Sequence, residues 1–385
     1  MSQQPDSSVE GEQSPLNLLK RWYHVPAFVG VVAFMLWTRL QSYGNFVRGG
    51  EVYFRGNDPW YHLRETSYIM QNWPSRMPFD VWTGFPVGTQ AGQFGTLWDH
   101  IMVVSTWIAG PIMGGTEEVM LIMAPLAGSL VAIPTYFIAK RFVDRPAAIA
   151  GAVTLALLPG TFFSYSLVGF PDHTAAEVLF QSIAVLGFLV AFGVAEREKP
   201  VWELVVDRDW TALKRPVSYA AAAGVGLGLY IWTWQPGILM VGFTGIYLAV
   251  KITSDVYHDQ SPEPVAFAGA VAMGVTTVMQ LIALDTLSFD TTGYSLLQVI
   301  LPLGVAAGAV FLAWLARFWE SRSIDEATYP PAVGGLIIAS VAVVWLAIPS
   351  LWSTIISNLL NTVAFSASAG ARTIGEAQPP LQNAA

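Results

Sequence analysis

The chain has 385 residues, of which 54% are hydrophobic and only 12% are charged, and its mean hydropathy is +0.49. This balance excludes an ordinary soluble domain and indicates an integral membrane protein. The formal net charge is −8, and neither a basic patch nor a phosphate-binding glycine motif is found, which argues against nucleic-acid and nucleotide binding. Because the chain contains no cysteine, disulfides, thiolate catalysis and cysteine-ligated zinc are excluded.

A polar segment precedes the first apolar run. Residues 1–19 are rich in Ser, Gln and Glu and lack the features of a cleavable signal peptide, so they are expected to form a disordered cytoplasmic tail. Lys20 and Arg21 follow, with Trp22 and Tyr23 at the entrance of the apolar run. Basic residues before a span and aromatic residues at the interface indicate a cytoplasmic N-terminus and an uncleaved anchor.

Nine apolar runs are predicted to cross the membrane, so the expected fold class is an all-α polytopic membrane protein. They cover residues 26–40, 119–139, 147–166, 178–195, 217–232, 238–250, 265–284, 296–316 and 332–351. Another run, residues 100–115, is shorter than the ~20 residues that a span needs and is expected to form an interfacial helix. With this assignment, thirteen of the nineteen basic residues fall on the cytoplasmic side, in agreement with the positive-inside rule.

Two long segments are expected on the external side, at either end of the transmembrane region formed by residues 20–351. Residues 41–118 are polar, aromatic and rich in Gly and Pro, which predicts a large first external loop. Residues 352–385 have the small and polar composition of a flexible external loop. The charge distribution alone therefore places Asp58, Asp172 and Glu376 on the same side of the membrane.

Each of these acidic residues has a structural explanation when it is taken alone. Asp58 is followed by Pro59, a pattern typical of a helix start, Asp172 suits a cap of the fourth span, and Glu376 suits a solvated loop. Three converging carboxylates would repel one another by ~4 kcal/mol per pair at 4 Å and an effective dielectric constant near 20. Their convergence would therefore require a cation, and an oxygen-rich site predicts Mg²⁺ or Mn²⁺.

Three motifs occur in a fixed order along the chain. They are Gly56-Asn57-Asp58-Pro59-Trp60-Tyr61 after the first span, Gly169-Phe170-Pro171-Asp172-His173-Thr174-Ala175-Ala176-Glu177 after the third, and Thr373-Ile374-Gly375-Glu376 after the ninth. From about Lys20 onward the chain resembles the catalytic subunit of oligosaccharyltransferase, and most closely the archaeal AglB branch of the STT3 family. The resemblance implies a GT-C type membrane fold.

The resemblance also implies a function. In this family a membrane glycosyltransferase transfers an oligosaccharide from a dolichyl phosphate or diphosphate carrier to the Asn of Asn-x-Ser/Thr in an acceptor polypeptide, on the external face of the cell membrane. Asp58, Asp172 and Glu376 would bind Mn²⁺ or Mg²⁺, and Asp58 and Glu376 would also contact the acceptor amide. Two carboxylates that accept hydrogen bonds from the amide would weaken its resonance, and the metal would offset charge on the leaving phosphate.

The sequence departs from the family pattern at three places. Thr174 stands two residues after Asp172, where another metal ligand is usual, so His173, Glu177 or water is expected to compensate. Tyr165 replaces an arginine that is frequent in relatives. The Trp-Trp-Asp-Tyr-Gly motif that reads the acceptor sequon, the remaining spans and the soluble C-terminal domain are not found in these 385 residues, so weak or no peptide glycosylation is expected from them alone.

Other interpretations remain open at this point. His62 could orient a ligand, but its position is more typical of an interfacial hydrogen-bonding residue. A different glycosyltransferase that uses polyprenyl-phosphate sugars would share the architecture without needing the Thr-Ile-Gly-Glu loop or a peptide. A transporter would carry ionisable residues in the middle of its spans, and the nearly charge-free runs here argue against one.

Overall fold

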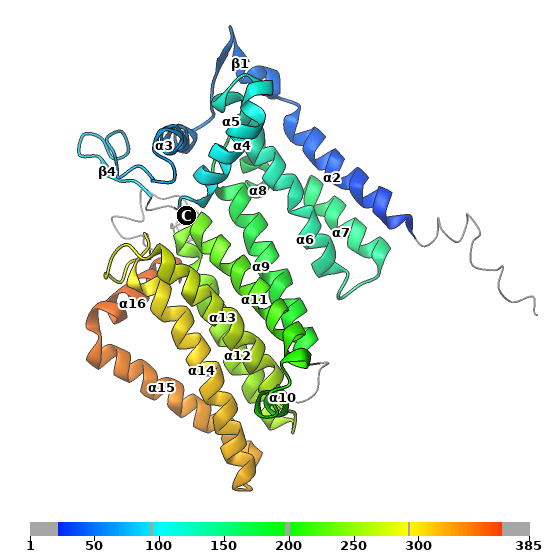
Figure 1. The fold of residues 1–385 in the computed structure, drawn as a ribbon, viewed down its shortest axis with the longest axis vertical. Helices are drawn as coiled ribbons and strands as arrows, with labels where there is room; N and C mark the ends of the chain where they lie inside the picture. The colour runs from blue at the N-terminus through cyan, green and yellow to red at the C-terminus, as the bar shows by residue number, and fades with distance from the viewer. Residues whose placement is uncertain (1–21, 93–94, 197–200, 292, 364–385) are drawn as a thin grey trace, which may run out of the picture. The chain divides into compact units, whose positions relative to one another are not determined.

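The computed structural model describes residues 22–92, 95–196, 201–291 and 293–363, which are mainly helical (Figure 1). The all-α polytopic membrane fold expected from the sequence is confirmed. The chain divides into two compact units. Unit 1 contains Met1–Leu189 and Trp232–Trp234, and unit 2 contains Val190–Ile231 and Gln235–Ala385.

Seven helical segments in the described part of the chain are long and apolar enough to cross a membrane. They are His24–Asn45, Thr116–Ala139, Thr174–Ala195, Gln235–Tyr257, Glu263–Ala283, Leu296–Ser321 and Glu326–Ala347. The expected span 217–232 lies in helix α11 (Trp210–Thr233), which has 24 residues. The expected span 147–166 is divided into α7 (Arg145–Leu157) and α8 (Thr161–Tyr165), since Pro159 and Gly160 interrupt the helix. Whether these two segments cross the membrane stays a prediction.

The helices of unit 1 pack around small apolar side chains. Helix α2 (His24–Leu40) contacts α5 (Thr116–Leu130), α6 (Ala132–Ala139) and α7. The core that α2, α6 and α7 share contains Val31, Met35, Ala132, Ala152 and Ala156. The small side chains of Ala132, Ala152 and Ala156 let the helix backbones approach closely. Close van der Waals packing of this kind stabilises helix association in a membrane, where the hydrophobic effect does not.

The segment that follows α2 in unit 1, expected as the first external loop, folds into short elements around two helices. A hairpin pairs β1 (Val47–Arg48) with β2 (Glu51–Val52), and a second hairpin pairs β3 (Phe79–Asp80) with β4 (Thr89–Gln90). Helix α3 (Asp58–Asn72) lies between them. Helix α4 (Leu97–Met113) follows and packs against α5. The predicted interfacial run 100–115 falls on α4, whose 17 residues keep it below the length of the seven spans.

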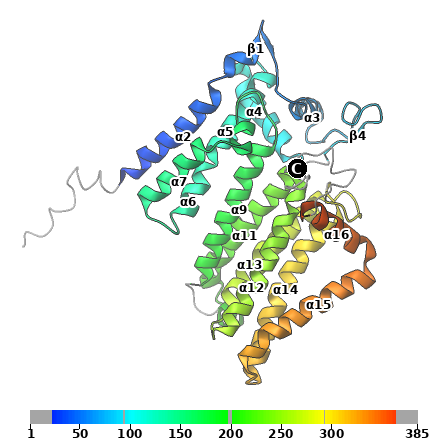
Figure 2. The ribbon, with the colours of Figure 1, turned by 180° about the vertical axis from the view of Figure 1, so that it is seen from behind.

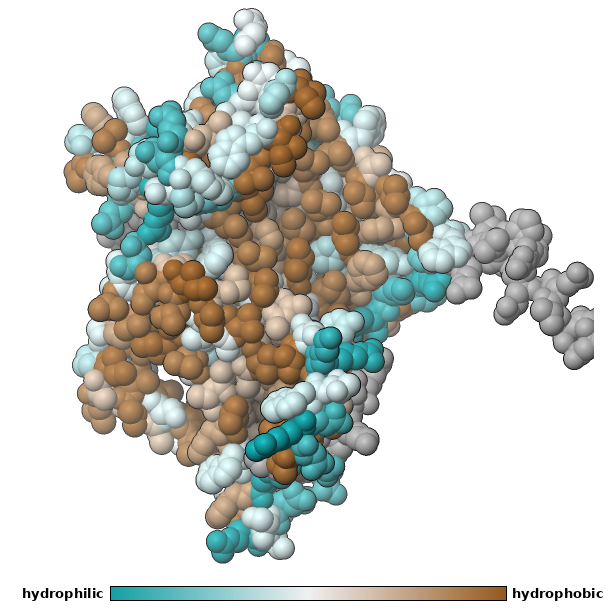
Figure 3. Space-filling model, in the orientation of Figure 1, coloured by the Kyte–Doolittle hydropathy of each residue, from teal (hydrophilic) through white to brown (hydrophobic). Residues whose placement is uncertain are grey.

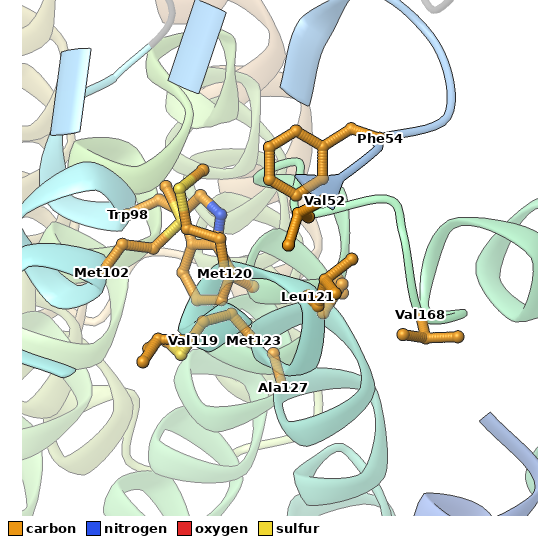
Figure 4. Close-up of a cluster of buried hydrophobic side chains, with 13 residues drawn as sticks. Val52, Phe54, Trp98, Met102, Val119, Met120, Leu121, Met123, Ala127 and Val168 are labelled. Atoms are coloured by element: carbon orange, nitrogen blue, oxygen red, sulfur yellow. The ribbon is translucent and has the colours of Figure 1, made fainter. Parts of the chain in front are cut away.

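A buried hydrophobic cluster holds this loop onto the membrane helices (Figure 4). Trp98 and Met102 of α4 meet Met120 and Leu121 of α5, and Val52 of β2 closes the cluster. The Trp98 side chain is only 3% exposed. Burying an aromatic ring of this size contributes roughly 2–3 kcal/mol, so the cluster holds α4 as a firm base for the loop.

Unit 2 is a set of long helices with short connections. In chain order they are α10 (Val201–Val206), α11, η3 (Gln235–Ile238), α12 (Leu239–Tyr257), α13 (Glu263–Ala283), α14 (Leu296–Ser321), η4 (Glu326–Thr328), α15 (Tyr329–Ala347) and α16 (Pro349–Val363). Helix α9 (Thr174–Ala195) begins in unit 1 and ends in unit 2. Helix α15 follows α14 on one side of the unit and leads into α16 (Figure 2).

The exposed side chains of these helices are mostly apolar (Figure 3). Phe243 on α12 and Ile338 on α15, for example, are 69% and 72% exposed. An exposed apolar surface of this extent is a lipid-facing surface. One expectation is wrong in part, because residues 352–363, predicted as the start of a flexible loop, continue helix α16. Apolar pairs four residues apart, Ile355-Ile356 and Leu359-Leu360, separated by polar residues suit an amphipathic helix, although the composition also suits a loop.

Candidate functional site

The residues that precede Asp58 and those that precede Asp172 lie side by side in unit 1. The backbone N–H of Arg55 donates a hydrogen bond to the carbonyl of Gly169 at 2.7 Å. Gly56 and Gly169 both have φ of +87° and pack against the rings of Phe170 and Phe46, respectively. Glycine is required at Gly169, since a Cβ atom there would lie 2.3 Å from the Phe46 ring. The first two sequence motifs therefore form one structural unit.

A buried arginine of α2 anchors the chain just before the second motif. Arg39, at the end of α2, is completely buried, and its Nε donates to the Ser166 hydroxyl at 2.8 Å. Its carbonyl accepts a hydrogen bond from the backbone N–H of Val168 at 3.1 Å. Gly128 on α5 makes room for this contact, because a Cβ atom there would lie 2.4 Å from Ser166. These contacts fix the chain four residues before Asp172.

His62 joins the two motifs through both of its ring nitrogens. It lies on α3, its side chain is buried, and its Nδ1 is 2.7 Å from Oδ1 of Asp99 on α4. Its Nε2 is 3.1 Å from Oδ1 of Asp172. The indole N–H of Trp98 donates to the carbonyl of Pro171 at 3.3 Å, which ties the start of α4 to the same loop. His62 thus bridges α3, α4 and the second motif.

The second motif adds a histidine and a hydroxyl around Asp172. His173 Nδ1 lies 2.8 Å from Asp172 Oδ1 and 3.1 Å from His62 Nε2, and its Nε2 lies 3.1 Å from Glu177 Oε1. The Thr174 hydroxyl donates a short hydrogen bond to Asp172 Oδ2. The Thr174 backbone N–H also points to that oxygen, at 3.4 Å. Asp172 therefore combines the role of a helix-start residue for α9 with a position at the centre of the cluster.

Three atoms of this cluster have the spacing of a metal site. They are His62 Nε2, Asp172 Oδ1 and His173 Nδ1, and their separations are 3.1, 3.1 and 2.8 Å. A divalent ion with octahedral geometry and ligand distances near 2.1 Å holds neighbouring ligands about 3.0 Å apart. The three ligand atoms therefore lie close enough together to hold one divalent cation once the ring protons between them have left, and their donor set is one carboxylate and two imidazoles.

The charges in the cluster stabilise one another. Burial alone would raise the pKa of Asp172, but His173 and His62 outweigh it and hold that pKa well below its usual value. Burial likewise opposes the charged form of His62, yet Asp99 and Asp172 raise its pKa to about 9. Burial also opposes a charged His173, and Asp172 and Glu177 raise its pKa well above the ordinary value. The same negative potential that holds these protons favours a bound cation.

A second buried carboxyl group lies on α3 one turn after His62. Glu65 is fully buried, and one of its oxygens accepts a hydrogen bond from the backbone N–H of Met77 at 3.1 Å. Burial and the nearby charge of Asp99 raise the pKa of Glu65 to about 8. At neutral pH this raised pKa favours the protonated form of Glu65.

Substitution Glu65→Gln should remove a pH dependence of stability. The folded chain holds the Glu65 proton up to about pH 8, whereas the ordinary pKa is near 4.5, so stability falls as the pH rises between these values. Glutamine keeps an acceptor for Met77 and cannot ionise. We expect the variant to unfold at a Tm roughly 5 °C higher than the parent chain at pH 8 and at a similar Tm at pH 5. Thermal unfolding in detergent at both pH values measures the difference, and equal Tm values at pH 8 would contradict it.

The structure brings some of the predicted site residues into the cluster and leaves others outside it. Asp172, His173, Thr174 and Glu177 all take part in the cluster. Asp58 is exposed and is the first residue of α3, since Asn57 rather than Asp58 occupies the cap position. Asp58 precedes His62 by four residues, and residues at this spacing share one helix face. Asp58 is not part of the three-residue group, and Glu376 lies outside the described residues.

Two residues of the cluster lie outside the site predicted from the sequence. For His62 the sequence leaves open that it orients a ligand but favours an interfacial role, although its spacing from Asp58 is a usable signal. Asp99 was not singled out, because one acidic residue at the start of an apolar helix is usually a favourable terminal charge. Only the packing of α3 against α4 shows that these two side chains meet.

Comparison with known proteins extends these observations. Residues 28–373 match the family model described as oligosaccharyl transferase STT3, N-terminal. The chain is 46% identical over 379 residues to the dolichyl-monophosphooligosaccharide–protein glycotransferase AglB of Haloferax volcanii, with 98% of this chain and 36% of the relative covered. The structure superimposes with a TM-score of 0.80 on Archaeoglobus fulgidus AglB in complex with an inhibitory peptide and a dolichol-phosphate, at 22% sequence identity. This match covers 95% of this chain and 43% of the Archaeoglobus chain.

A second Archaeoglobus fulgidus oligosaccharyltransferase structure, a complex with Zn and sulfate, matches with a TM-score of 0.71 at 24% identity and covers 87% of this chain and 42% of that one. The chain thus spans roughly two fifths of the length of these relatives. The family model, by contrast, covers nearly the whole chain. On this evidence the chain belongs to the STT3 oligosaccharyl transferase family, of which it matches the N-terminal part.

Proposed function

We propose that the chain forms the membrane-embedded catalytic part of an oligosaccharyltransferase. It would transfer an oligosaccharide from a dolichyl phosphate-type carrier to the Asn of Asn-x-Ser/Thr in an acceptor polypeptide, on the external face of the cell membrane. The observation that carries the proposal is the cluster of His62, Asp172 and His173, which unites the first two family motifs in a site fit for a divalent cation. The name of the Haloferax relative, a dolichyl-monophosphooligosaccharide–protein glycotransferase, supports the dolichyl-linked donor and the protein acceptor.

The cation would be held by Asp172 and the two histidines, with Asp58 and Glu376 as further carboxylates. When bound, a divalent ion offsets the negative charge that develops on the leaving phosphate. The sequence predicts Mg²⁺ or Mn²⁺ on the basis of an oxygen-rich site. The three-residue group instead offers two imidazole nitrogens and one carboxylate oxygen. Because Mg²⁺ prefers oxygen ligands, the donor set favours Mn²⁺ over Mg²⁺. The Zn complex of an Archaeoglobus relative supports a metal in this fold that accepts nitrogen ligands.

The acceptor amide needs activation as well as orientation. The lone pair of an amide nitrogen is delocalised, so the nitrogen is a weak nucleophile. Asp58 and Glu376 would accept hydrogen bonds from the two amide N–H groups and so favour the conformation in which the lone pair is free to attack. The exposed position of Asp58 at the first turn of α3, one turn before His62, supports this role because an acceptor peptide can reach it.

A transfer assay with single carboxylate substitutions tests the proposed function. We expect Asp58→Ala and Glu376→Ala each to reduce glycosylation of an Asn-x-Thr peptide by a lipid-linked oligosaccharide about 100-fold or more in the presence of Mn²⁺. The substitutions are compared in a version extended by the C-terminal portion of the Haloferax relative, because the 385 residues alone are expected to transfer weakly or not at all. Glu51→Ala is the matched control, because Glu51 is an exposed acidic residue of the same external loop. Full activity of both Asp58→Ala and Glu376→Ala would remove the catalytic assignment.

A further inference from the structure

We propose that Asp99 is a positioning residue for the metal site and acts through His62. Asp99 would hold the His62 ring in the tautomer and orientation that direct Nε2 at the cation. This inference rests on the metal site of the proposed function and extends it to two residues that the sequence motifs do not include. It also explains why a completely buried carboxylate occurs in the external loop.

The geometry around His62 assigns a different task to each ring nitrogen. Nδ1 lies 2.7 Å from a carboxylate oxygen of Asp99. A carboxylate accepts and cannot donate, so this contact places a proton on Nδ1. Nε2 lies 3.1 Å from Asp172 Oδ1 and 3.1 Å from His173 Nδ1. In the metal-free chain Asp172 favours a proton on Nε2 as well, and a cation that binds there would replace this proton and take the Nε2 lone pair. A carboxylate behind a histidine that faces a metal is the common arrangement by which proteins orient such ligands.

The position of Asp99 on its helix does not account for its burial. Asp99 lies in the first turn of α4, where a negative charge is favourable. That effect is available to an exposed side chain, whereas Asp99 is 0% exposed. Its Oδ1 contacts His62, and its Oδ2 is buried with no hydrogen-bond partner among the described residues. Burying a carboxylate is costly unless a partner compensates, so the contact with His62 is the feature that justifies it.

His62 and Asp99 are both held by helices. His62 lies within α3 and Asp99 within α4, and the two helices pack against each other. Trp98, the neighbour of Asp99, is buried in the hydrophobic cluster of Figure 4 and donates to the carbonyl of Pro171. A ligand held by regular elements keeps its geometry better than one held by a loop. The consequence for specificity is a nitrogen-rich site that selects Mn²⁺ over Mg²⁺.

Manganese binding to the purified 385-residue chain tests the inference without reference to transfer activity. Electron paramagnetic resonance of free Mn²⁺ gives the Kd, and competition with Mg²⁺ gives the selectivity. In Asp99→Asn the amide can donate to Nδ1 and place the ring proton on Nε2, where it blocks the lone pair. We expect a Kd for Mn²⁺ that is 10- to 100-fold weaker and a smaller preference for Mn²⁺ over Mg²⁺, with retained helix content.

The matched control is Asp80→Asn. Asp80 is a buried aspartate of the same external loop, but its partner is Arg64 at 2.6 Å and not a residue of the cluster. The chemical change is the same, so a general weakening of the loop would appear in both variants. We expect Asp80→Asn to lower the Tm and to leave the Kd for Mn²⁺ within about twofold.

A double-substitution cycle separates positioning from a purely structural role. If Asp99 acts through His62, Asp99→Asn should add no further loss of Mn²⁺ affinity to His62→Ala. An unchanged Kd in Asp99→Asn, an equal loss in the His62→Ala background, or no Mn²⁺ binding by the parent chain would overturn the inference. Failure of the proposed function gives a different result. In that case Mn²⁺ binding depends on His62 and Asp99 as expected, but no sugar is transferred.

Discussion

Asp172→Asn should abolish both metal binding and oligosaccharide transfer, with losses of about 100-fold or more in each. Asp172 is the only carboxylate of the three-residue group and contacts both histidines. Asparagine preserves the shape of the side chain and can still accept the Thr174 hydrogen bond. It removes the charge, however, so the cation loses its anionic ligand, and the two imidazoles lose the carboxylate that lies between them.

The effect of Asp172→Asn should also appear in the histidine titrations. Because Asp172 contributes to the raised pKa values of His62 and His173, both should fall in the variant. Nuclear magnetic resonance of the histidine rings in the metal-free chain measures this shift. Asp144→Asn is a suitable control, since Asp144 caps α7 on the surface and asparagine is an equally good cap. Wild-type Mn²⁺ affinity in Asp172→Asn would exclude the proposed metal centre.

Gly169→Ala should destabilise the chain by about 2–5 kcal/mol and separate the two motifs. The estimate combines the cost of an L-residue in the left-handed region, ~1–2 kcal/mol, with overpacking of ~1–3 kcal/mol. At Gly169 the backbone has φ of +87°, and the new methyl group would lie 2.3 Å from the Phe46 ring. Relief of this clash requires the Phe46 ring or the Gly169 backbone to shift, and Gly169 is the residue whose carbonyl accepts the 2.7 Å hydrogen bond between the motifs.

The chain offers a close control for this prediction. Gly50 also has φ of +87°, but no atom lies within 4 Å of the position where its Cβ would be. Gly50→Ala therefore reports the conformational cost alone, about 1–2 kcal/mol. Thermal unfolding and the Kd for Mn²⁺ should both change much more in Gly169→Ala than in Gly50→Ala. Equal effects of the two substitutions would show that the contact with Phe46 does not hold the site together.

Much of the fold was predictable because hydropathy is a local property of the sequence. Long apolar runs identified the membrane helices that make up most of both units. Predictions failed or remained incomplete where local signals competed. Pro159 and Gly160 divide a run that hydropathy reads as continuous, and residues 352–363 have a composition that suits either a loop or an amphipathic helix.

The candidate site was also predictable only in part. The motifs around Asp58 and Asp172 were visible in the sequence, and Asp172, His173, Thr174 and Glu177 do meet in the structure. Asp58 and Glu376 stay predictions as ligands. His62 and Asp99 emerge only from the structure, because their roles depend on contacts with residues far away in the chain and not on their neighbours in the sequence.

The membrane environment, the helical class and the loops that carry the acidic residues follow from apolar length, charge bias and motif order, which are all encoded along the chain. Tertiary structure alone decided which atoms surround Asp172. The contacts of His62 with Asp99 and with Asp172 cross 37 and 110 residues of chain. Such contacts arise from the packing of α3 against α4 and from the close approach of Arg55 to Gly169, and no local pattern reports either one.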